Sequence, residues 1–308
     1  MTFKPNRRAG CWIALVALAA SALALTACGG GKTAAPKGSV EDELGFDQAG
    51  IAERQSRVEA AISDCMRAQG FDYVPIDPLA QRAAIAGSAR LSDDDFLNQF
   101  GYGISTLFGR GGAQADPNER IREALSAPDR AAYERALWGE NAGATFAQAN
   151  DSGDFTRLGG CTKQSTEKVF GGIETLNGLV GKLDGLDEQI SQDQRMVRAV
   201  EQWSACMTDA GFKYDEPDDI DGDILERFQG IVGPKVEAGA TSAPNPDTTF
   251  DQDSLTTLQG QEVATAKADV ACETKFITPV EEVVRPQYEA TFREQNKELL
   301  TRVPKPGA

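Results

Sequence analysis

Residues 63–73 read Ser-Asp-Cys-Met-Arg-Ala-Gln-Gly-Phe-Asp-Tyr, and residues 204–214 read Ser-Ala-Cys-Met-Thr-Asp-Ala-Gly-Phe-Lys-Tyr. Six of the eleven positions are identical, whereas unrelated segments of this length would share about one. An apolar residue also precedes each copy, Ile62 in the first and Trp203 in the second. The match predicts a weak internal repeat that divides the chain into two units.

Each copy of this motif has the features of a helix C-terminus. Gly70 and Gly211 fall where a chain leaves a helix in the left-handed conformation, which glycine adopts at least cost. In this Schellman arrangement the Phe after the glycine packs on the Met of the same copy. The aromatic residues could form a binding edge, but we favour a structural role as a helix stop with a local hydrophobic clasp.

The N-terminus is typical of an exported lipoprotein. A segment with three basic residues precedes the apolar run Trp12–Leu25, which is too short to span a bilayer comfortably. The run ends in Leu-Thr-Ala-Cys-Gly at residues 25–29, which resembles the lipobox of bacterial lipoproteins. We therefore predict a signal peptide over residues 1–27 and attachment of lipid to Cys28, which would hold the chain at the outer face of the cell membrane.

The composition after the predicted signal limits the partners. Residues 28–46 are rich in Gly, Ala, Lys and Pro, and we predict a lipidated flexible tether there. The signal holds three of the 31 basic residues and none of the 47 acidic ones, so 28 basic residues remain and the formal charge is −19. Such a charge repels nucleic acid, which we exclude as a partner. The expected partners are membrane lipid through Cys28 and an envelope protein or cell-wall component.

The cysteines predict a covalent framework. Cys11 leaves with the signal and Cys28 takes the lipid, so four cysteines remain: Cys65, Cys161, Cys206 and Cys272. An even number in an oxidising compartment predicts two disulfides, for which three pairings exist. Because each unit holds one motif cysteine and one later cysteine, we predict Cys65–Cys161 and Cys206–Cys272.

The absence of histidine excludes many catalytic sites. It removes Ser-His-Asp and Cys-His arrangements and every His-ligated metal, and no Cys-x-x-Cys occurs. The acidic run 219–223 has part of a calcium-loop pattern, but a solvated acidic segment before a helix fits it better. We predict no catalytic, cofactor-binding or metal-binding residues.

The apolar periodicity is helical, and we find no long alternating run typical of strands. We therefore predict a mainly α fold of two disulfide-stapled helical units, residues 47–185 and 186–308. Predicted helices cover residues 47–69, 79–90, 93–100, 117–125, 128–138, a stretch that opens at Cys161, 171–185, 191–210, 224–232, 253–276 and 278–302. Glycine-rich stretches are predicted to be loops: residues 101–112, which we expect to be mobile, residues 141–160 and residues 233–250. Thr278 is predicted to cap the last helix, and Pro286 to kink it.

Several motifs together resemble a known group of proteins. They are the lipobox, both motif copies, Ala-Tyr-Glu-Arg-Ala-Leu-Trp-Gly at residues 132–139 and Ala-Lys-Ala-Asp-Val-Ala-Cys at residues 266–272. With them the chain resembles uncharacterised secreted lipoproteins of actinobacteria. The resemblance implies a lipid-anchored location and a disulfide pattern, and it implies no reaction.

Three functions remain as hypotheses. The leading one is a non-enzymatic binding or accessory module of the cell envelope, so we expect no enzymatic activity. The first alternative is a solute-binding lipoprotein of a transporter, which would have α/β lobes with parallel strands. The second is a cell-wall hydrolase that uses two carboxyl groups, which a buried pair facing one cleft would favour.

Overall fold

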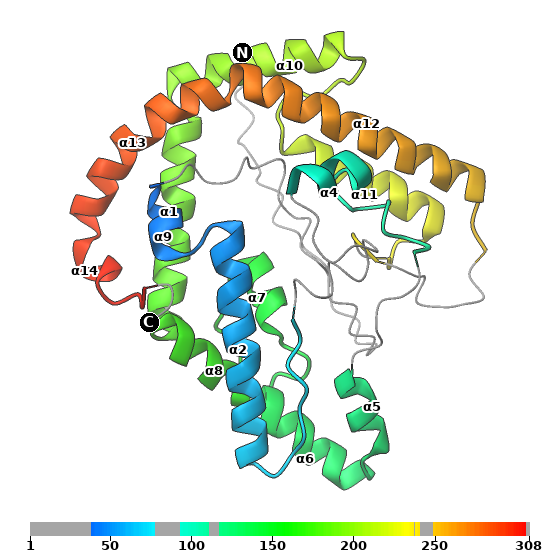
Figure 1. Cartoon of the computed structure of the whole chain (residues 1–308), viewed down its shortest axis with the longest axis vertical. Helices are drawn as coiled ribbons and strands as arrows, with labels where there is room; N and C mark the ends of the chain where they lie inside the picture. The colour runs from blue at the N-terminus through cyan, green and yellow to red at the C-terminus, as the bar shows by residue number, and fades with distance from the viewer. Residues whose placement is uncertain (1–37, 78–92, 111–116, 237, 241–248, 306–308) are drawn as a thin grey trace, which may run out of the picture.

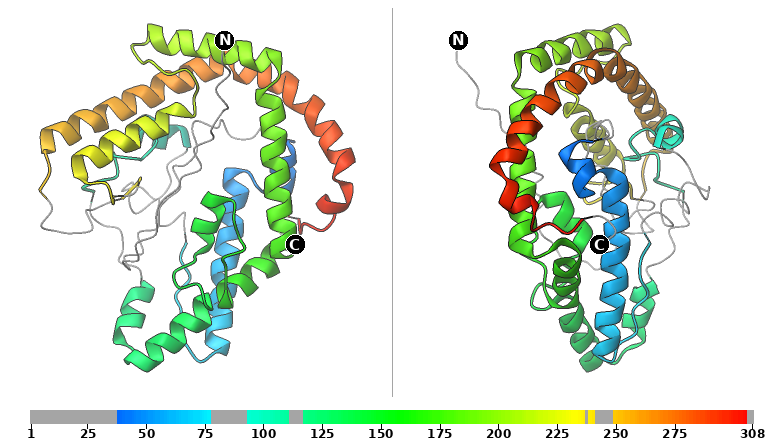
Figure 2. Two further views of the ribbon diagram at one scale, coloured as in Figure 1. Left: turned by 180° about the vertical axis from the view of Figure 1, so that it is seen from behind. Right: turned by 60° about the vertical axis from the view of Figure 1, so that its left-hand side comes forward.

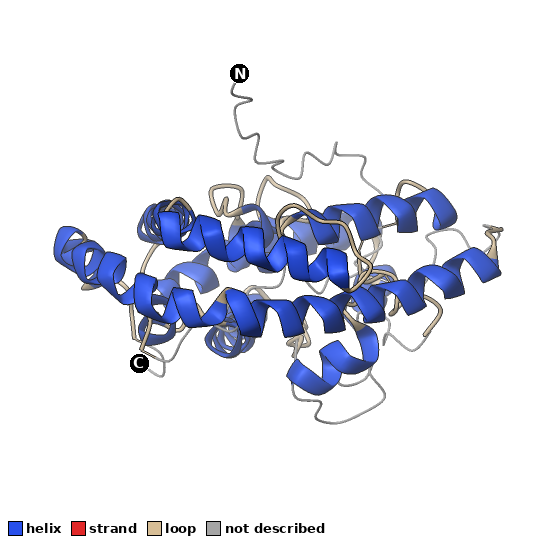
Figure 3. Ribbon diagram, turned by 90° about the horizontal axis from the view of Figure 1, so that it is seen from above, coloured by secondary structure: helices blue, strands red, loops and turns tan. Residues whose placement is uncertain are grey.

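The computed structural model describes residues 38–77, 93–110, 117–236, 238–240 and 249–305. All regular structure within these ranges is helical and none of it is a strand, which confirms the predicted mainly α fold (Figure 3). The helices are α1 (Val40–Leu44), α2 (Gln48–Ala68), α4 (Asp93–Phe100), α5 (Pro117–Ala124), α6 (Ala127–Trp138), α7 (Phe146–Ser152), α8 (Gly160–Phe170), α9 (Ile173–Ser191), α10 (Gln194–Asp209), α11 (Asp219–Val232), α12 (Gln252–Phe276), α13 (Thr278–Gln295) and α14 (Lys297–Leu300). In the described part of the chain, no helix combines the length and the apolar character needed to cross a bilayer.

The helices form two groups (Figure 1). Helices α4, α10, α11 and α12 lie together at the top of the view, whereas α2, α5, α6, α7 and α8 lie below them. Helix α9 runs from one group to the other and contacts both α8 and α10, and α13 lies beside it (Figures 1 and 2).

Each group buries its own apolar core. The N-terminal core surrounds Tyr133 and Phe170, and the C-terminal core surrounds Trp203 and Phe228. Helix α9 contributes Leu176 to the first core and further leucines to the second. The C-terminal core also contains side chains from α1 and from the segment after α4, so the two cores interleave along the sequence.

Both motif copies end their helices as predicted. In each copy the N–H of the Phe donates to the carbonyl of the Met five residues earlier, at 3.0 Å in the first and 2.8 Å in the second. Gly70 and Gly211 have φ angles of +85° and +98°, where a β carbon is unfavourable. The motif serine also donates its hydroxyl to the carbonyl of the motif tyrosine, at 2.9 Å and 2.6 Å.

Two disulfides are present with the predicted pairing. Cys65–Cys161 joins α2 to α8, and Cys206–Cys272 joins α10 to α12. Each bridge therefore fixes the helix that ends in a motif copy to a second helix of the same group.

The prediction of a flexible tether over residues 28–46 is wrong for its last part. The hydroxyl of Ser39 accepts the N–H of Asp42 at 3.1 Å and caps α1, as expected of an N-cap serine. Val40 and Leu44 are only 1% and 8% exposed because they pack in the C-terminal core. Val40 and Leu44 are one helical turn apart, so both side chains face the core and stabilise the folded segment that begins at Ser39.

The prediction that the glycine-rich stretch 101–112 is a mobile loop is wrong for its described residues. Ile104 and Phe108 lie in the C-terminal core. Glu262 of α12 accepts the main-chain N–H groups of Ile104 and Ser105 at 2.7 and 2.8 Å. Because these buried N–H groups have a carboxylate partner, the segment can be irregular and still be part of the core.

Three other predictions require correction. Helix α7 forms inside the predicted loop 141–160 because Phe146 stacks on Phe170, with ring centroids 5.3 Å apart. Helix α11 begins at Asp219 rather than at residue 224, so the acidic run forms its first turn. Thr278 makes no capping bond: its hydroxyl is buried, and no described residue pairs with it.

Helix α13 continues through Pro286 along a curved path (Figure 1). The predicted helix 79–90, the predicted signal peptide and Cys28 lie outside the described residues.

Candidate functional site

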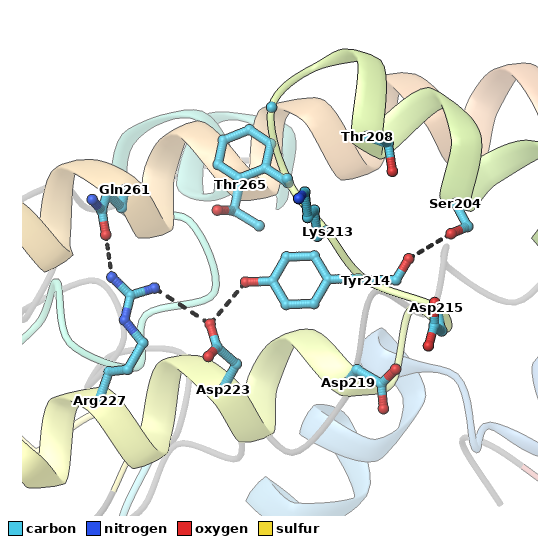
Figure 4. A pocket seen from close by; sticks show the side chains of 12 residues that line it. Ser204, Thr208, Lys213, Tyr214, Asp215, Asp219, Asp223, Arg227, Gln261 and Thr265 are labelled. Atoms are coloured by element: carbon cyan, nitrogen blue, oxygen red, sulfur yellow. Dashed lines mark hydrogen bonds and ion pairs between the residues drawn. The ribbon is translucent and has the colours of Figure 1, made fainter.

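An open depression of about 950 Å³ lies where the second motif copy leaves α10 (Figure 4). Its walls come from the end of α10, the segment after it, α11 and α12. The side chains that define it include Thr208, Lys213, Tyr214, Asp223, Arg227 and Gln261. The Schellman end of α10 places the lysine and tyrosine here, because it turns the chain sharply after the helix.

The polar groups on one side of this depression are already paired. The hydroxyl of Tyr214 donates to Asp223 at 2.9 Å, and Arg227 donates to the same carboxylate at 3.3 Å (Figure 4). Arg227 also donates to Gln261 of α12. Burial and the hydrogen bond to Asp223 raise the pKa of Tyr214, so the phenol stays protonated and acts as a donor.

The other side of the depression carries groups that are available to a ligand. Lys213 is exposed and makes no ion pair with any described residue. Asp215 and Asp219 are also exposed, and Asp219 accepts the N–H of Glu216 at 3.2 Å. The surface is therefore polar and of mixed charge, and it does not resemble a closed apolar pocket for a small molecule.

A smaller depression of about 320 Å³ lies at the first motif copy. Its lining includes Ser63, Arg67, Phe71, Asp72 and Tyr73. The same five motif positions line the larger depression as Ser204, Thr208, Phe212, Lys213 and Tyr214. Corresponding positions of the two motif copies therefore line both depressions.

Buried carboxyl groups form a second feature, between α11 and α12. Glu262, Asp269 and Glu273 lie on one face of α12 and are almost fully buried. Asp269 accepts the hydroxyl of Tyr102 at 2.7 Å and the indole N–H of Trp203 at 2.8 Å. These donors satisfy the carboxylate in the way that buried polar groups require.

Asp221 of α11 is the fourth member of this group, which we call the acid cluster. Both of its carboxyl oxygens are buried and pair with no described residue. Burial raises the pKa of Asp221 to about 8, and the carboxylates of Glu262 and Asp269 add to the rise. Burial likewise raises the pKa of Glu273 to about 9, with Asp269 contributing.

Raised carboxyl pKa values are a property of general acids, but none of the four acid-cluster residues lines either of the two depressions. Neither of these two depressions therefore supplies the cleft onto a buried carboxyl pair that would favour a hydrolase. Sequence reasoning missed it, although the spacing of residues 262, 269 and 273 places three acids on one helical face.

Metal binding and cysteine chemistry find no support in the described ranges. Within them, no group of three or more acidic or cysteine side chains is arranged to hold a metal ion. The four predicted disulfide cysteines are all bonded in pairs, so they offer no free thiolate.

No family model matches the chain, and no curated protein and no solved structure matches it.

Proposed function

We propose that this chain is an exported lipoprotein, held on the outer face of the cell membrane by lipid on Cys28. In this proposal it acts as a non-enzymatic binding or accessory module that engages a protein or cell-wall component of the envelope. The chain itself would supply a rigid helical surface, and the lipid would confine that surface to the membrane.

The two disulfides are the observation that carries this proposal. Each one joins two helices at the base of a motif copy. Disulfides of this kind are rare in reducing compartments and common in exported proteins. With Cys11 in the predicted signal, Cys28 is left as the cysteine that takes the lipid.

The geometry favours binding over hydrolysis. None of the acid-cluster residues lines either of the two depressions, whereas Asp223, which lines the larger one, accepts hydrogen bonds from Tyr214 and Arg227. The solute-binding alternative expects parallel strands, and the described residues form helices.

In-cell crosslinking tests the proposal. Wild type and Cys28→Ala are crosslinked in cells, extracted with detergent and identified with their partners by mass spectrometry. We expect wild type to incorporate fatty acid and yield one membrane complex, and Cys28→Ala to lose both. Cys11→Ala is the matched control, because it removes a cysteine from the predicted signal and should behave as wild type.

A wild-type chain without lipid, or a Cys28→Ala chain that stays in the membrane fraction, would contradict the anchor. Turnover of purified peptidoglycan by the intact protein would instead favour the hydrolase.

A further inference from the structure

The first motif copy is covered by another part of the same chain. The side-chain amide of Asn118, on α5, accepts the main-chain N–H of Val74 at 2.8 Å and donates to the carbonyl of Val74 at 2.9 Å. Ile121 of the same helix lines the depression. A carboxamide has one donor and one acceptor group at its end, so it can satisfy both main-chain groups of one residue.

Among the residues that the structure describes, none covers the second motif copy in this way. Asp215 stands where the first copy has Val74, one position after the motif tyrosine. Neither the N–H nor the carbonyl of Asp215 pairs with any described residue. The depression here measures about 950 Å³, against about 320 Å³ at the covered copy.

We propose that the depression at Tyr214 binds a segment of a partner protein that presents an Asn or Gln side chain to the main chain of Asp215. This assignment rests on the proposed function, and it names the surface and the chemistry of the contact. The partner segment takes the place that α5 takes at the first copy. An apolar side chain beside the amide packs on Phe212, and the exposed Lys213 favours an acidic neighbour.

The chain itself provides the probe. A peptide with the sequence of residues 117–126, Pro-Asn-Glu-Arg-Ile-Arg-Glu-Ala-Leu-Ser, is titrated into the isotope-labelled full chain in detergent micelles, and amide shifts are followed by NMR. We expect saturable shifts at Lys213 and Asp215 and none at Val74. The same peptide carrying Asn118→Leu should bind at least about tenfold more weakly, because it loses both hydrogen bonds.

A pair of protein variants locates the binding. Thr208→Arg introduces a long side chain into the depression at an exposed position and should weaken peptide binding at least about tenfold. Ala132→Arg adds the same charge at an exposed position of α6 and should leave binding unchanged. Equal binding to both peptides, or no shift at Asp215, would overturn the inference. Shifts at Asp215 with a soluble peptidoglycan fragment but not with the peptide would overturn it in favour of a saccharide.

In-cell crosslinking of Thr208→Arg separates this inference from the proposed function. Loss of the wild-type partner in Thr208→Arg but not in Ala132→Arg supports the site. Recovery of the partner with Thr208→Arg leaves the proposed function intact and shows that the site is wrong. Absence of any partner with wild type contradicts the proposed function, and this inference with it.

Discussion

Glu262 accepts hydrogen bonds from both the main-chain N–H and the side-chain hydroxyl of Ser105, which lies 157 residues earlier in the chain. The N–H of Ile104 donates to the other oxygen of the same carboxylate at 2.7 Å. Three donors of an irregular, buried segment therefore share one acidic side chain. An unpaired buried N–H costs about 1–3 kcal/mol, so this carboxylate holds the segment in the core.

Glu262→Gln should lower the free energy of unfolding by about 2–4 kcal/mol. The amide nitrogen would replace one carboxylate oxygen, and it cannot accept a hydrogen bond from the donors that face it. Urea unfolding measures the loss, and proteolysis within residues 101–110 should become faster. Glu201→Gln, at an exposed position of α10, is the control and should change neither property. Equal stability of both variants would show that the carboxylate does not hold the segment.

The acid cluster should make the protein less stable as the pH rises. The pKa values of Asp221 and Glu273 rise from 3.8 and 4.5 to about 8 and about 9 on folding. Between about pH 4 and pH 9 the folded state therefore binds more protons than the unfolded state, and the free energy of unfolding falls with increasing pH. The slope from each group is at most about 1.4 kcal/mol per pH unit. Urea unfolding from pH 5 to pH 9 measures it.

Asp221→Asn should flatten this pH dependence, because it removes a group that loses its proton in the window. The charged groups that raise the pKa of Asp221 are all acidic, namely Glu262, Asp269 and Asp218. Replacing Asp221 by the neutral Asn should therefore also stabilise the protein at alkaline pH, because it removes a charge that these groups repel. Asp184→Asn removes an exposed carboxyl from α9 and should leave the slope unchanged. A slope that is the same in wild type and Asp221→Asn would mean that Asp221 ionises normally.

Each disulfide should contribute several kcal/mol. The bridges close loops with sequence separations of 96 and 66 residues, for which loop entropy predicts about 4–5 kcal/mol each. We expect the double variants Cys65→Ser/Cys161→Ser and Cys206→Ser/Cys272→Ser to lose comparable stability in urea unfolding. A reducing agent should further destabilise each variant only through its remaining bridge. A variant as stable as wild type would show that the bridge it lacks does not stabilise the protein by lowering the chain entropy of the unfolded state.

Arg54→Lys should destabilise the protein by about 2–4 kcal/mol, because an ammonium group cannot reproduce the guanidinium fork. Arg54 is fully buried and donates to the carbonyls of Leu44, Val169 and Pro304. It therefore links α2 to the end of α1 and to two distant segments. Thermal unfolding measures this loss. Arg67→Lys, at a largely exposed position of the same helix, is the control and should not lower the melting temperature. A melting temperature that falls equally in both would contradict this role.

Local signals in the sequence predicted where α2 and α10 end, and the division of the cysteines between two units predicted the disulfide pairing. The glycine and the Met–Phe pair of each motif copy determine the turn by themselves, because these contacts lie within six consecutive residues. Helix α1 could not be predicted, since five residues form a stable helix only through distant contacts such as that of the Val40 N–H with Glu289.

The same distinction applies to the candidate site. The sequence placed Tyr73 and Tyr214 at equivalent positions, but it did not reveal that one surface is covered and the other open. That difference depends on where Asn118 and α5 lie in the fold. The acid cluster likewise depends on how α11 packs on α12, and no motif encodes that packing.

The two disulfides also determine how the chain would respond to a pulling force. If tension entered from an anchored N-terminus, α1 and α2 could unravel only as far as Cys65. The 96 and 66 residues that separate the bonded cysteines could not lengthen while the bridges remain. Roughly 570 Å of contour length would thus be withheld from extension. The two bridges would therefore limit how far such a molecule extends under load.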